Sequence, residues 1–426
     1  MSKNMKIIPE LRFPEFENEG EWEEKELGKL AKKITERNKD SLVKDVFTNS
    51  AIDGIVDQRD YFDKDIADKN NLENYYIVKE GDYVYNPRIS NIAPVGPISK
   101  NKTNKEGAMS PLYTVFRFDS KNNDFFEYYF KSEHWYNAIR KVSNTGARFD
   151  RMSIADSAFM EIPVLSPSPK EQQKIASCLS SLDEVIATHS QKLELLKDHK
   201  KGLMQNLFPQ EGEKVPKYRF KEFEKDGEWL EKNLENYIDL FSGIALKSEE
   251  ISDDQSGRPI LRGINITEGY IRHSKDIDKY FLGSIENMEK YFVKKNDIVI
   301  GMDGSKVGKN VALVGKGDED SILIQRVARI RTNEKADIHF IYQFLISDKF
   351  RAYVDIVNTS SGIPHISSQQ IKDFKIGIPP KLKEQQKIAS CLSSLDSLIT
   401  AEAEKIEQLK WHKKGLMQGL FPKINE

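Results

Sequence analysis

The sequence has few of the residues that enzymes and metal sites most often use. Its 426 residues include 2 cysteines and 7 histidines, and these do not fall at metal-ligand spacings. No Gly-x-Ser-x-Gly nucleophile elbow occurs, and no glycine-rich cofactor loop opens a strand–helix–strand unit. These absences predict a chain with no catalytic residue, no metal and no cofactor of its own.

A strong net charge and long apolar runs are also missing. The net charge is −2, so a nucleic-acid-binding surface would have to be local rather than global. No run of about 18 apolar residues occurs, which excludes a predicted membrane span. Met1–Pro9 has no signal-peptide core, and this favours the cytoplasm.

Two segments come close to catalytic motifs without completing them. Gly304–Asn310 has the outline of a phosphate-binding loop, but it is one residue too short between its glycines, and Asn310 replaces the Ser or Thr that binds magnesium. Asn86–Ile89 begins like the Asn-Pro-Pro-aromatic signature of adenine methyltransferases, but it lacks the second proline and the aromatic residue. Neither segment predicts a nucleotide site or a methyl-donor site.

What the sequence does contain is a repeat. Lys170–Asp183 returns unchanged at Lys383–Asp396, and Lys200–Pro209 returns with one change at Lys413–Pro422. Both blocks return at an offset of 213 residues (383 − 170 and 413 − 200), so no residue was gained or lost between them. Internal repeats outrank local motifs as evidence of architecture, and the constant offset indicates a rod whose length matters.

Seam positions in the repeated blocks alternate steps of four and three, which is the heptad pattern of a coiled coil, and all but His189 and Lys200 in the first copy are apolar. In the first copy the seam contains Ile175, Leu179, Leu182, Ile186, Leu193, Leu196, Leu203 and Leu207. The pattern predicts two long helices, 167–209 and 379–426, that pack against each other; the alternative is two helices buried in separate cores. Cys178 and Cys391 occupy the same position in the two copies, where small helix residues are favoured over a disulfide.

Polar residues interrupt the seam, and an antiparallel arrangement gives them partners. In that arrangement the two copies exchange places, so Asp183 lies beside Lys413 and Asp396 lies beside Lys200. We expect both interhelical pairs to form and to fix the register of the helices.

A variable block precedes each rod. The blocks begin alike, with Pro-x-Leu-Arg-Phe-Pro-x-Phe at 9–16 and Pro-Lys-Tyr-Arg-Phe-Lys-x-Phe at 216–223. Their interiors share no identity, but both contain short β-type runs, an amphipathic helix, a glycine-centred loop and a last strand before the rod. The sequence therefore predicts an α+β protein. Two mixed α/β domains of the same fold, 1–166 and 210–378, are separated by the two antiparallel coiled-coil helices, with pseudo-two-fold symmetry.

The expected elements can be given by residue. In the first block we expect strands at Tyr75–Val78, Gly81–Tyr85, Pro94–Ile98, Leu112–Phe118 and Phe159–Val164, and a helix at Phe125–Val142. In the second block we expect strands at Tyr291–Val293, Asp297–Ile300, Val311–Val314, Ile322–Ile330 and Phe374–Ile378, and a helix at Ile338–Val357.

Polar residues gather in the loops of both blocks at matched positions. Such side chains can donate to base edges or pair with phosphates. The candidates are Arg88, Ser90, Asn91, Arg148 and Arg151 in the first block, and Ser305, Lys306, Lys309, Arg326 and His365 in the second. Taken singly, most would be solvated loop residues; their matched placement favours a DNA-binding surface.

The order of these motifs resembles the specificity subunit of type I restriction-modification systems. The resemblance rests on the motifs at 9–16 and 216–223, on Pro-x-x-x-Glu-Gln-x-x-Ile at 167–175 and 380–388, and on Lys-Gly-Leu-Met-Gln-x-Leu-Phe-Pro at 201–209 and 414–422. It implies a non-catalytic subunit with two target-recognition domains. Each domain would read one half of a bipartite target in double-stranded DNA, while the helices set the gap.

The same resemblance implies partners. Two methylation subunits, which bind S-adenosylmethionine, would dock on the helices, and motor-nuclease subunits that use ATP and magnesium would join through the complex. A helix from Lys170 to Leu207 would be about 57 Å long, or about 17 base pairs of DNA. Two other functions stay open from the residues alone: a coiled-coil adaptor with two protein-binding domains, and a self-contained DNA-modifying enzyme.

Overall fold

The computed structural model describes the chain over residues 7–61, 72–143, 150–358 and 364–422. Contacts divide the chain into two compact units. Unit 1 contains Met1–Ser190 and Glu404–Glu426, and unit 2 contains Gln191–Ala403. Each of the two long helices therefore contributes residues to both units.

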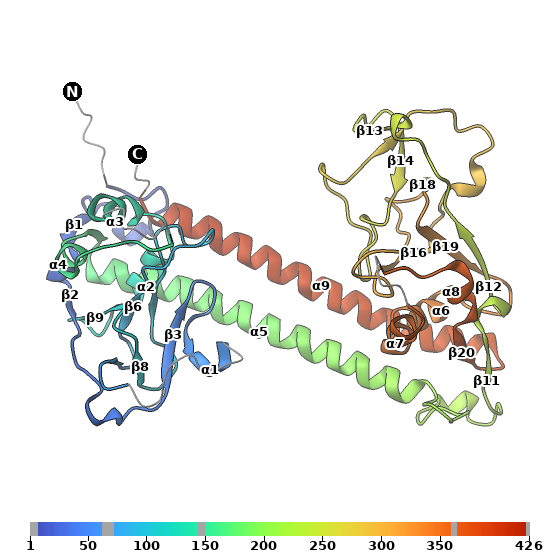
Figure 1. The fold of residues 1–426 in the computed structure, drawn as a ribbon, viewed down its shortest axis with the longest axis horizontal. Helices are drawn as coiled ribbons and strands as arrows, with labels where there is room; N and C mark the ends of the chain where they lie inside the picture. The colour runs from blue at the N-terminus through green and yellow to red at the C-terminus, as the bar shows by residue number, and fades with distance from the viewer. Residues whose placement is uncertain (1–6, 62–71, 144–149, 359–363, 423–426) are drawn as a thin grey trace. The chain divides into compact units, whose positions relative to one another are not determined.

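The repeated segments form α5, Pro169–Leu207, and α9, Leu382–Leu420, each 39 residues long (Figure 1). The prediction of two long helices is confirmed. α5 begins at Pro169, which has no backbone N–H. No hydrogen bond is lost there, because N–H groups in the first turn of a helix have no partner within the helix.

The two helices are antiparallel within each unit, as predicted. In unit 1, Ile175 near the start of α5 shares a core with Leu420 at the end of α9. In unit 2, Leu207 at the end of α5 shares a core with Ile388 near the start of α9. One helix face buried against a second helix is the packing that a heptad stripe requires.

Unit 1 is built on small sheets and short helices. Its strands are β1 (Glu23–Glu26), β2 (Ala31–Lys33), β3 (Val46–Ser50), β4 (Gly54–Asp57), β5 (Tyr76–Val78), β6 (Tyr83–Tyr85), β7 (Ile98–Lys100), β8 (Gly107–Met109), β9 (Thr114–Phe118) and β10 (Pro163–Ser166). Its short helices are α1 (Gln58–Tyr61), α2 (Asp124–Phe130), α3 (Tyr136–Val142) and α4 (Asp156–Met160), with 3-10 turns at Pro14–Phe16, Leu27–Lys29 and Lys39–Ser41. The sheet orders are β2-β9-β6-β7, β4-β3-β8-β5 and β1-β10, and only β3 and β8 are parallel neighbours among these described strands.

Unit 2 has the same plan. Its strands are β11 (Leu230–Asn233), β12 (Ile238–Ser242), β13 (Ile251–Ser252), β14 (Arg258–Leu261), β15 (Tyr280–Phe281), β16 (Ile298–Gly301), β17 (Val311–Leu313), β18 (Ile322–Leu323), β19 (Val327–Thr332) and β20 (Lys375–Ile378). Its short helices are α6 (Ile338–Leu345), α7 (Asp348–Val357) and α8 (Ser368–Asp373), with 3-10 turns at Lys221–Phe223, Leu234–Asn236, Ser248–Glu250 and Glu289–Tyr291. The sheet orders are β12-β19-β16-β17, β13-β15-β14-β18 and β11-β20, with β14 and β18 parallel.

The register of the central sheets shows that the two units are copies of one fold. In unit 1, Tyr85 pairs with Ile98 on β7 and with Thr114 on β9. In unit 2, Ile300 pairs with Val311 on β17 and with Ala328 on β19. The prediction of an α+β protein with two domains of the same fold is therefore confirmed.

The Leu-Phe-Pro tails of the repeat place a phenylalanine in each core. Phe421 lies 5.9 Å from Trp22 and 5.5 Å from Phe125, measured between ring centroids, in unit 1. Phe208 lies 6.1 Å from Trp229 in unit 2. Aromatic pairs of this geometry bury large apolar areas, and they join the end of each long helix to the unit it belongs to.

Each predicted amphipathic helix is two helices in the structure. Phe125–Val142 divides into α2 and α3, and Ile338–Val357 divides into α6 and α7. Serines mark both breaks, because Ser132 donates to a carbonyl of α2 and Ser347 caps the first turn of α7. The apolar periodicity continues across the breaks and hides them from a sequence-based prediction.

Four predicted strands also differ. Ile322–Ile330 is interrupted at Arg326, whose φ of 66° turns the chain between β18 and β19. Tyr291–Val293 is the end of a 3-10 turn and a single bridge. Pro94–Ile98 joins its sheet only at its last residue, and Phe159–Val164 covers the end of α4 and the start of β10. The other predicted strands are present as β5, β6, β9, β16, β17 and β20, with small shifts at their ends.

Candidate nucleic-acid interface

Unit 1 brings Arg88 and Arg151 onto neighbouring backbone segments just beyond the end of β6. The two residues form an antiparallel bridge, and the N–H of Ile89 donates to the carbonyl of Asp150 at 3.0 Å. Arg88 is exposed, and Arg151 is half-buried with its Nε 3.8 Å from the carboxylate of Asp150. Two candidates that are far apart in sequence therefore lie side by side.

Ser90 and Asn91 lie in the tight turn that follows. The backbone N–H of Ser90 donates to the carbonyl of Ala93 at 3.0 Å, and the N–H of Ala93 donates back to the carbonyl of Ser90 at 3.1 Å. The hydroxyl of Ser90 also accepts from Ala93, so it has a local structural role. Asn91 is exposed at the apex, and Arg148 lies outside the described residues.

Unit 2 repeats this bridge with different side chains. Asp303 and His365 form an antiparallel bridge beyond the end of β16, and the N–H of Gly304 donates to the carbonyl of Pro364 at 3.0 Å. His365 is exposed. Asp303 thus occupies the backbone position of Arg88, and His365 occupies that of Arg151.

Three further candidates of unit 2 lie in one turn. Ser305, Lys306 and Lys309 are exposed in the turn that joins β16 to β17, which begins at Gly304 with a φ of 97°. The carbonyl of Lys306 accepts from the N–H of Lys309 at 3.0 Å, which fixes the turn. Both ammonium groups are therefore presented to solvent from a defined backbone, an arrangement suited to phosphate contacts.

Arg326 lies at the apex of the β18–β19 turn, next to the bridge. Its Nη1 donates to the Oδ2 of Asp303 at 2.9 Å, and its side chain is 66% exposed. Its carbonyl accepts from the N–H of Met302 at 2.9 Å. Three unit 2 residues from separate segments, Asp303, Arg326 and His365, thus meet at one end of the sheet.

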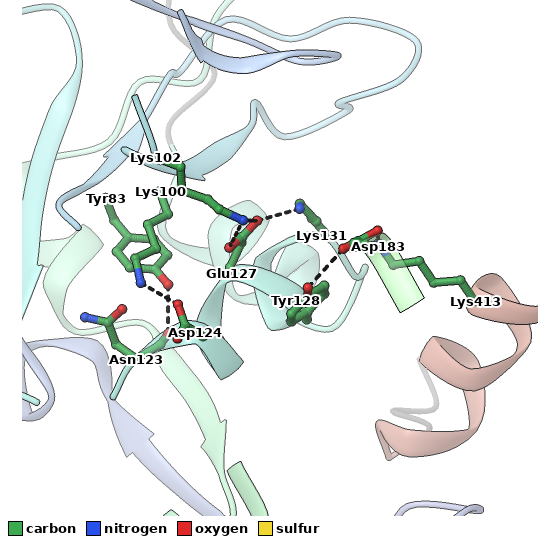
Figure 2. A network of polar contacts seen from close by, with 10 residues as sticks. All are labelled: Tyr83, Lys100, Lys102, Asn123, Asp124, Glu127, Tyr128, Lys131, Asp183 and Lys413. Atoms are coloured by element: carbon green, nitrogen blue, oxygen red, sulfur yellow. Dashed lines mark hydrogen bonds and ion pairs between the residues drawn. The ribbon is translucent and has the colours of Figure 1, made fainter. Parts of the chain in front are cut away.

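The interhelical pair expected in unit 1 is present, and Figure 2 shows its surroundings. The Nζ of Lys413 on α9 lies 2.5 Å from the Oδ1 of Asp183 on α5. The hydroxyl of Tyr128 donates to the other carboxylate oxygen of Asp183 at 2.9 Å, and the Lys413 ammonium lies 5.2 Å from the centre of the Tyr128 ring. Burial, followed by the charge of Asp183, raises the pKa of Tyr128, so its hydroxyl stays protonated as a donor.

The matching pair of unit 2 is also present. The Nζ of Lys200 lies 2.6 Å from the Oδ1 of Asp396, and the Nε2 of Gln343 donates to the Oδ2 of Asp396 at 3.0 Å. Gln343 comes from α6, as Tyr128 comes from α2, the corresponding helix of unit 1. Each aspartate therefore ties both long helices to a short helix of its own unit.

Sequence reasoning missed a second pair of matched contacts at the helices. Arg12 makes two hydrogen bonds to Glu171, at 2.9 and 2.8 Å, and Arg219 makes two to Glu384, both at 2.8 Å. All four side chains are almost fully buried. The hydrogen bonds to the glutamates are the main cause that raises the pKa of each arginine. The signal was available, because each arginine lies in the repeated Arg-Phe motif and each glutamate in the Glu-Gln motif.

Three further observations concern the described residues. Over those residues, no group of His, Cys, Asp and Glu is arranged to hold a metal ion. In the same part of the chain, no helix has both the length and the apolar character that crossing a membrane needs. Cys178 and Cys391 are free thiols.

The fold defines a duplicated protein: one α+β unit occurs twice, with different polar turns at one end of each copy. Comparison with known families agrees with this class. The chain belongs to the family described as the type I restriction modification DNA specificity domain, which matches residues 19–198 and 227–411.

Individual relatives give the same family. The chain is 29% identical over 269 residues to the specificity subunit of the type I restriction enzyme MjaVIII of Methanocaldococcus jannaschii, an alignment that covers 62% of each protein. It is 28% identical over 197 residues to the EcoBI specificity subunit of Escherichia coli, covering 45% of this chain and 38% of the relative. The chain thus spans less than two thirds of the length of these relatives.

A solved structure shares the fold. The S subunit of a type I restriction-modification system from M. genitalium superposes with a TM-score of 0.62, at 16% sequence identity. The superposition covers 98% of this chain and 100% of that structure. This likeness concerns the fold of the chain and not its individual contacts.

Proposed function

We propose that this chain is the DNA-reading subunit of a type I restriction-modification complex and that it has no catalytic role of its own. One observation carries the proposal beside the family match: the two units share a fold and its register but present different side chains at the same turns. Two copies of one scaffold with unlike contact surfaces suit a target made of two unlike half-sites.

The proposed partners follow from this function. Duplex DNA with a bipartite target would contact the turns, and two methylation subunits would dock on the helices and bind S-adenosylmethionine. Motor-nuclease subunits would use ATP and magnesium in the same cytoplasmic complex. The cofactors belong to those subunits, and this chain would contribute only recognition and assembly.

Mapping the methylated adenines tests the function. A host that expresses this chain with its methylation subunits should carry methylated adenines in a single bipartite motif, read by single-molecule sequencing. Replacing residues 210–378 with the matching segment of another family member should change one half of the motif and leave the other half intact. A contiguous motif, or a motif unaffected by the replacement, would contradict the proposal.

Two controls separate the alternatives. If the chain is a protein-binding adaptor, its complex with the methylation subunits will retain a scrambled DNA as strongly as the mapped target. If the chain is itself an enzyme, the purified chain will transfer labelled methyl groups from S-adenosylmethionine to DNA without any partner.

We also propose that the helix pair sets the gap between the half-sites. A continuous helix of 39 residues is about 58 Å long at about 1.5 Å per residue, and α5 and α9 have the same length. Inserting one heptad into both helices keeps each seam in phase and lengthens each helix by about 10 Å, or about 3 base pairs. The mapped gap between the half-sites should widen by that amount. An unchanged gap would contradict the proposal. The control is a heptad inserted into α5 alone, which should disturb folding because the two helices then differ in length.

A further inference from the structure

Three backbone positions coincide in the two units, and their side chains differ. Two of them are the partners in the bridge beyond β6 or β16. The third lies two residues before Thr114 on β9, which pairs with Tyr85, or two residues before Ala328 on β19, which pairs with Ile300. The three positions carry Arg88, Leu112 and Arg151 in unit 1, and Asp303, Arg326 and His365 in unit 2.

In unit 2 the cation of this cluster is held in a fixed orientation. The backbone of Arg326 has a φ of 66°, and its carbonyl is anchored by the N–H of Met302. The hydrogen bond from Nη1 to Asp303 restrains the guanidinium at one end. Among the described residues, the Nε and Nη2 edge of Arg326 has no partner, and this edge is the fork that matches two acceptors side by side.

The aspartate argues for a base edge rather than a phosphate as the target of Arg326. Asp303 neutralises the charge of the arginine, and its own carboxylate would be repelled by a nearby phosphate. A guanine offers two neutral acceptors, O6 and N7, at the spacing of the arginine fork. A neutralised but oriented guanidinium therefore fits guanine better than the DNA backbone.

In unit 1 the same backbone positions carry side chains of different chemistry. Arg88 stands at the place of Asp303, and Leu112, which is 62% exposed, stands at the place of Arg326. Pro87 stands at the place of Met302 and has no N–H, so the anchor of the turn carbonyl is absent at this position. An exposed apolar side chain suits the methyl group of a thymine.

We propose that these three positions read base edges in both units: Arg326, positioned by Asp303, binds a guanine in the half-site of unit 2, and Leu112 contacts a thymine methyl in the half-site of unit 1. This inference rests on the proposed function. The two half-sites differ at this position because the same scaffold places a hydrogen-bonding fork in one unit and an apolar group in the other.

The test uses the full chain assembled with its methylation subunits and the host genome as the probe. In Arg326→Gln, one position of the unit 2 half-site should lose its preference for guanine by about 5- to 150-fold, the range of one bidentate contact, while the unit 1 half-site stays unchanged. Asp303→Ala should relax the same position, because the guanidinium loses the acceptor that holds its Nη1. Leu112→Ala should relax a thymine of the other half-site.

Lys316→Gln is the matched control. Lys316 is exposed after β17, at the opposite end of the β16–β17 hairpin from the cluster, and its loss should leave every base preference unchanged. Urea unfolding midpoints show whether each variant folds.

Three results would overturn the inference: no guanine in the wild-type unit 2 half-site, unchanged preferences in Arg326→Gln, or equal weakening on every sequence, which marks a phosphate contact. If the wild-type protein gives no bipartite motif at all, the proposed function itself has failed.

Discussion

Units 1 and 2 agree where they contact the long helices and disagree at the turns beyond β6 and β16. The Arg–Glu contacts and the Lys–Asp contacts are the same in both units, although the short-helix donor to the aspartate changes from Tyr128 to Gln343. At the turns, Arg88 corresponds to Asp303 and Leu112 to Arg326. The difference shows that the contacts with the long helices are shared by the two units, whereas the side chains at the turns are not. Under the proposed function, the turns are where target preference would change.

The largest expected effect comes from breaking the buried Arg–Glu contacts. Glu384→Ala leaves Arg219 buried without its partner and should destabilise unit 2 by about 3–5 kcal/mol. Glu384 also accepts from the Nε1 of Trp229 at 3.3 Å, whereas the Nε1 of Trp22 has no partner among the described residues. Glu171→Ala should therefore cost unit 1 less than Glu384→Ala costs unit 2.

Urea unfolding with a fluorescence probe measures these two variants. The matched control is Glu222→Ala, because Glu222 pairs with Lys387 at 2.9 Å but both side chains are about half exposed. Such a pair contributes about 0–1 kcal/mol. An equal loss of unfolding free energy in Glu384→Ala and Glu222→Ala would show that the buried contact contributes no more to stability than an exposed ion pair.

A smaller effect is expected where the two units use different donors to the same aspartate. Tyr128→Phe removes one hydrogen bond to Asp183 and keeps the ring, so it should destabilise unit 1 by about 0.5–1.5 kcal/mol. Gln343→Leu should cost unit 2 less, because it removes the hydrogen bond from Nε2 to Asp396 but also removes Oε1, which is buried without a partner among the described residues. Tyr353→Phe is the control, because it also removes one tyrosine hydroxyl, which donates to the carbonyl of Gln370 and not to a residue of the long helices. A Tyr128→Phe variant as stable as wild type would contradict the proposed anchoring of Asp183.

The smallest expected effect is a change of stability with pH that has opposite signs in the two units. In unit 1, burial lowers the pKa of His134, whose Nε2 donates to the carbonyl of Pro422 and whose buried Nδ1 has no partner among the described residues. The unfolded state then binds more protons than the folded state. The contribution of His134 to the free energy of unfolding is therefore present above about pH 6.5 and is lost as the pH falls through the pKa of the folded state.

In unit 2, His273 responds the other way. Partial burial opposes its charged form, but hydrogen bonds with Asp318 and Asp278 outweigh burial and raise its pKa. The folded state then binds more protons than the unfolded state. The contribution of His273 to the free energy of unfolding is therefore present below about pH 6.5 and is lost as the pH rises through the pKa of the folded state. Unfolding curves of His134→Gln and His273→Gln at pH 5.5 and pH 7.5 measure both trends; the same sign in both variants would refute the assignment.

Sequence reasoning reached the helices and the register because those features repeat. A constant offset and a heptad pattern leave few alternatives, and the positions of Asp183 and Lys413 follow from an antiparallel pairing of equal rods. The strands were found where β-branched residues alternate, but Arg326 was placed inside a strand because its left-handed backbone has no signal in an Arg residue.

The candidate surface was harder to predict for a physical reason. The turns that hold Arg88 and Asp303 are defined by backbone bridges to segments about sixty residues later, at Arg151 and His365. Contacts of that range depend on the whole sheet, and the two units share no sequence identity there. Polar composition could select the loops, but it could not show that Asp303 orients Arg326.

Unit 1 is completed by residues that are translated after all of unit 2. Leu420 and Phe421 are 4% and 0% exposed in its core, and the N–H of Leu11 donates to the carbonyl of Gly419. On the ribosome, unit 2 can therefore acquire all of its residues while unit 1 still lacks the segment that closes its core. A frameshift after Ala403 would accordingly damage the part of the protein that was synthesised first.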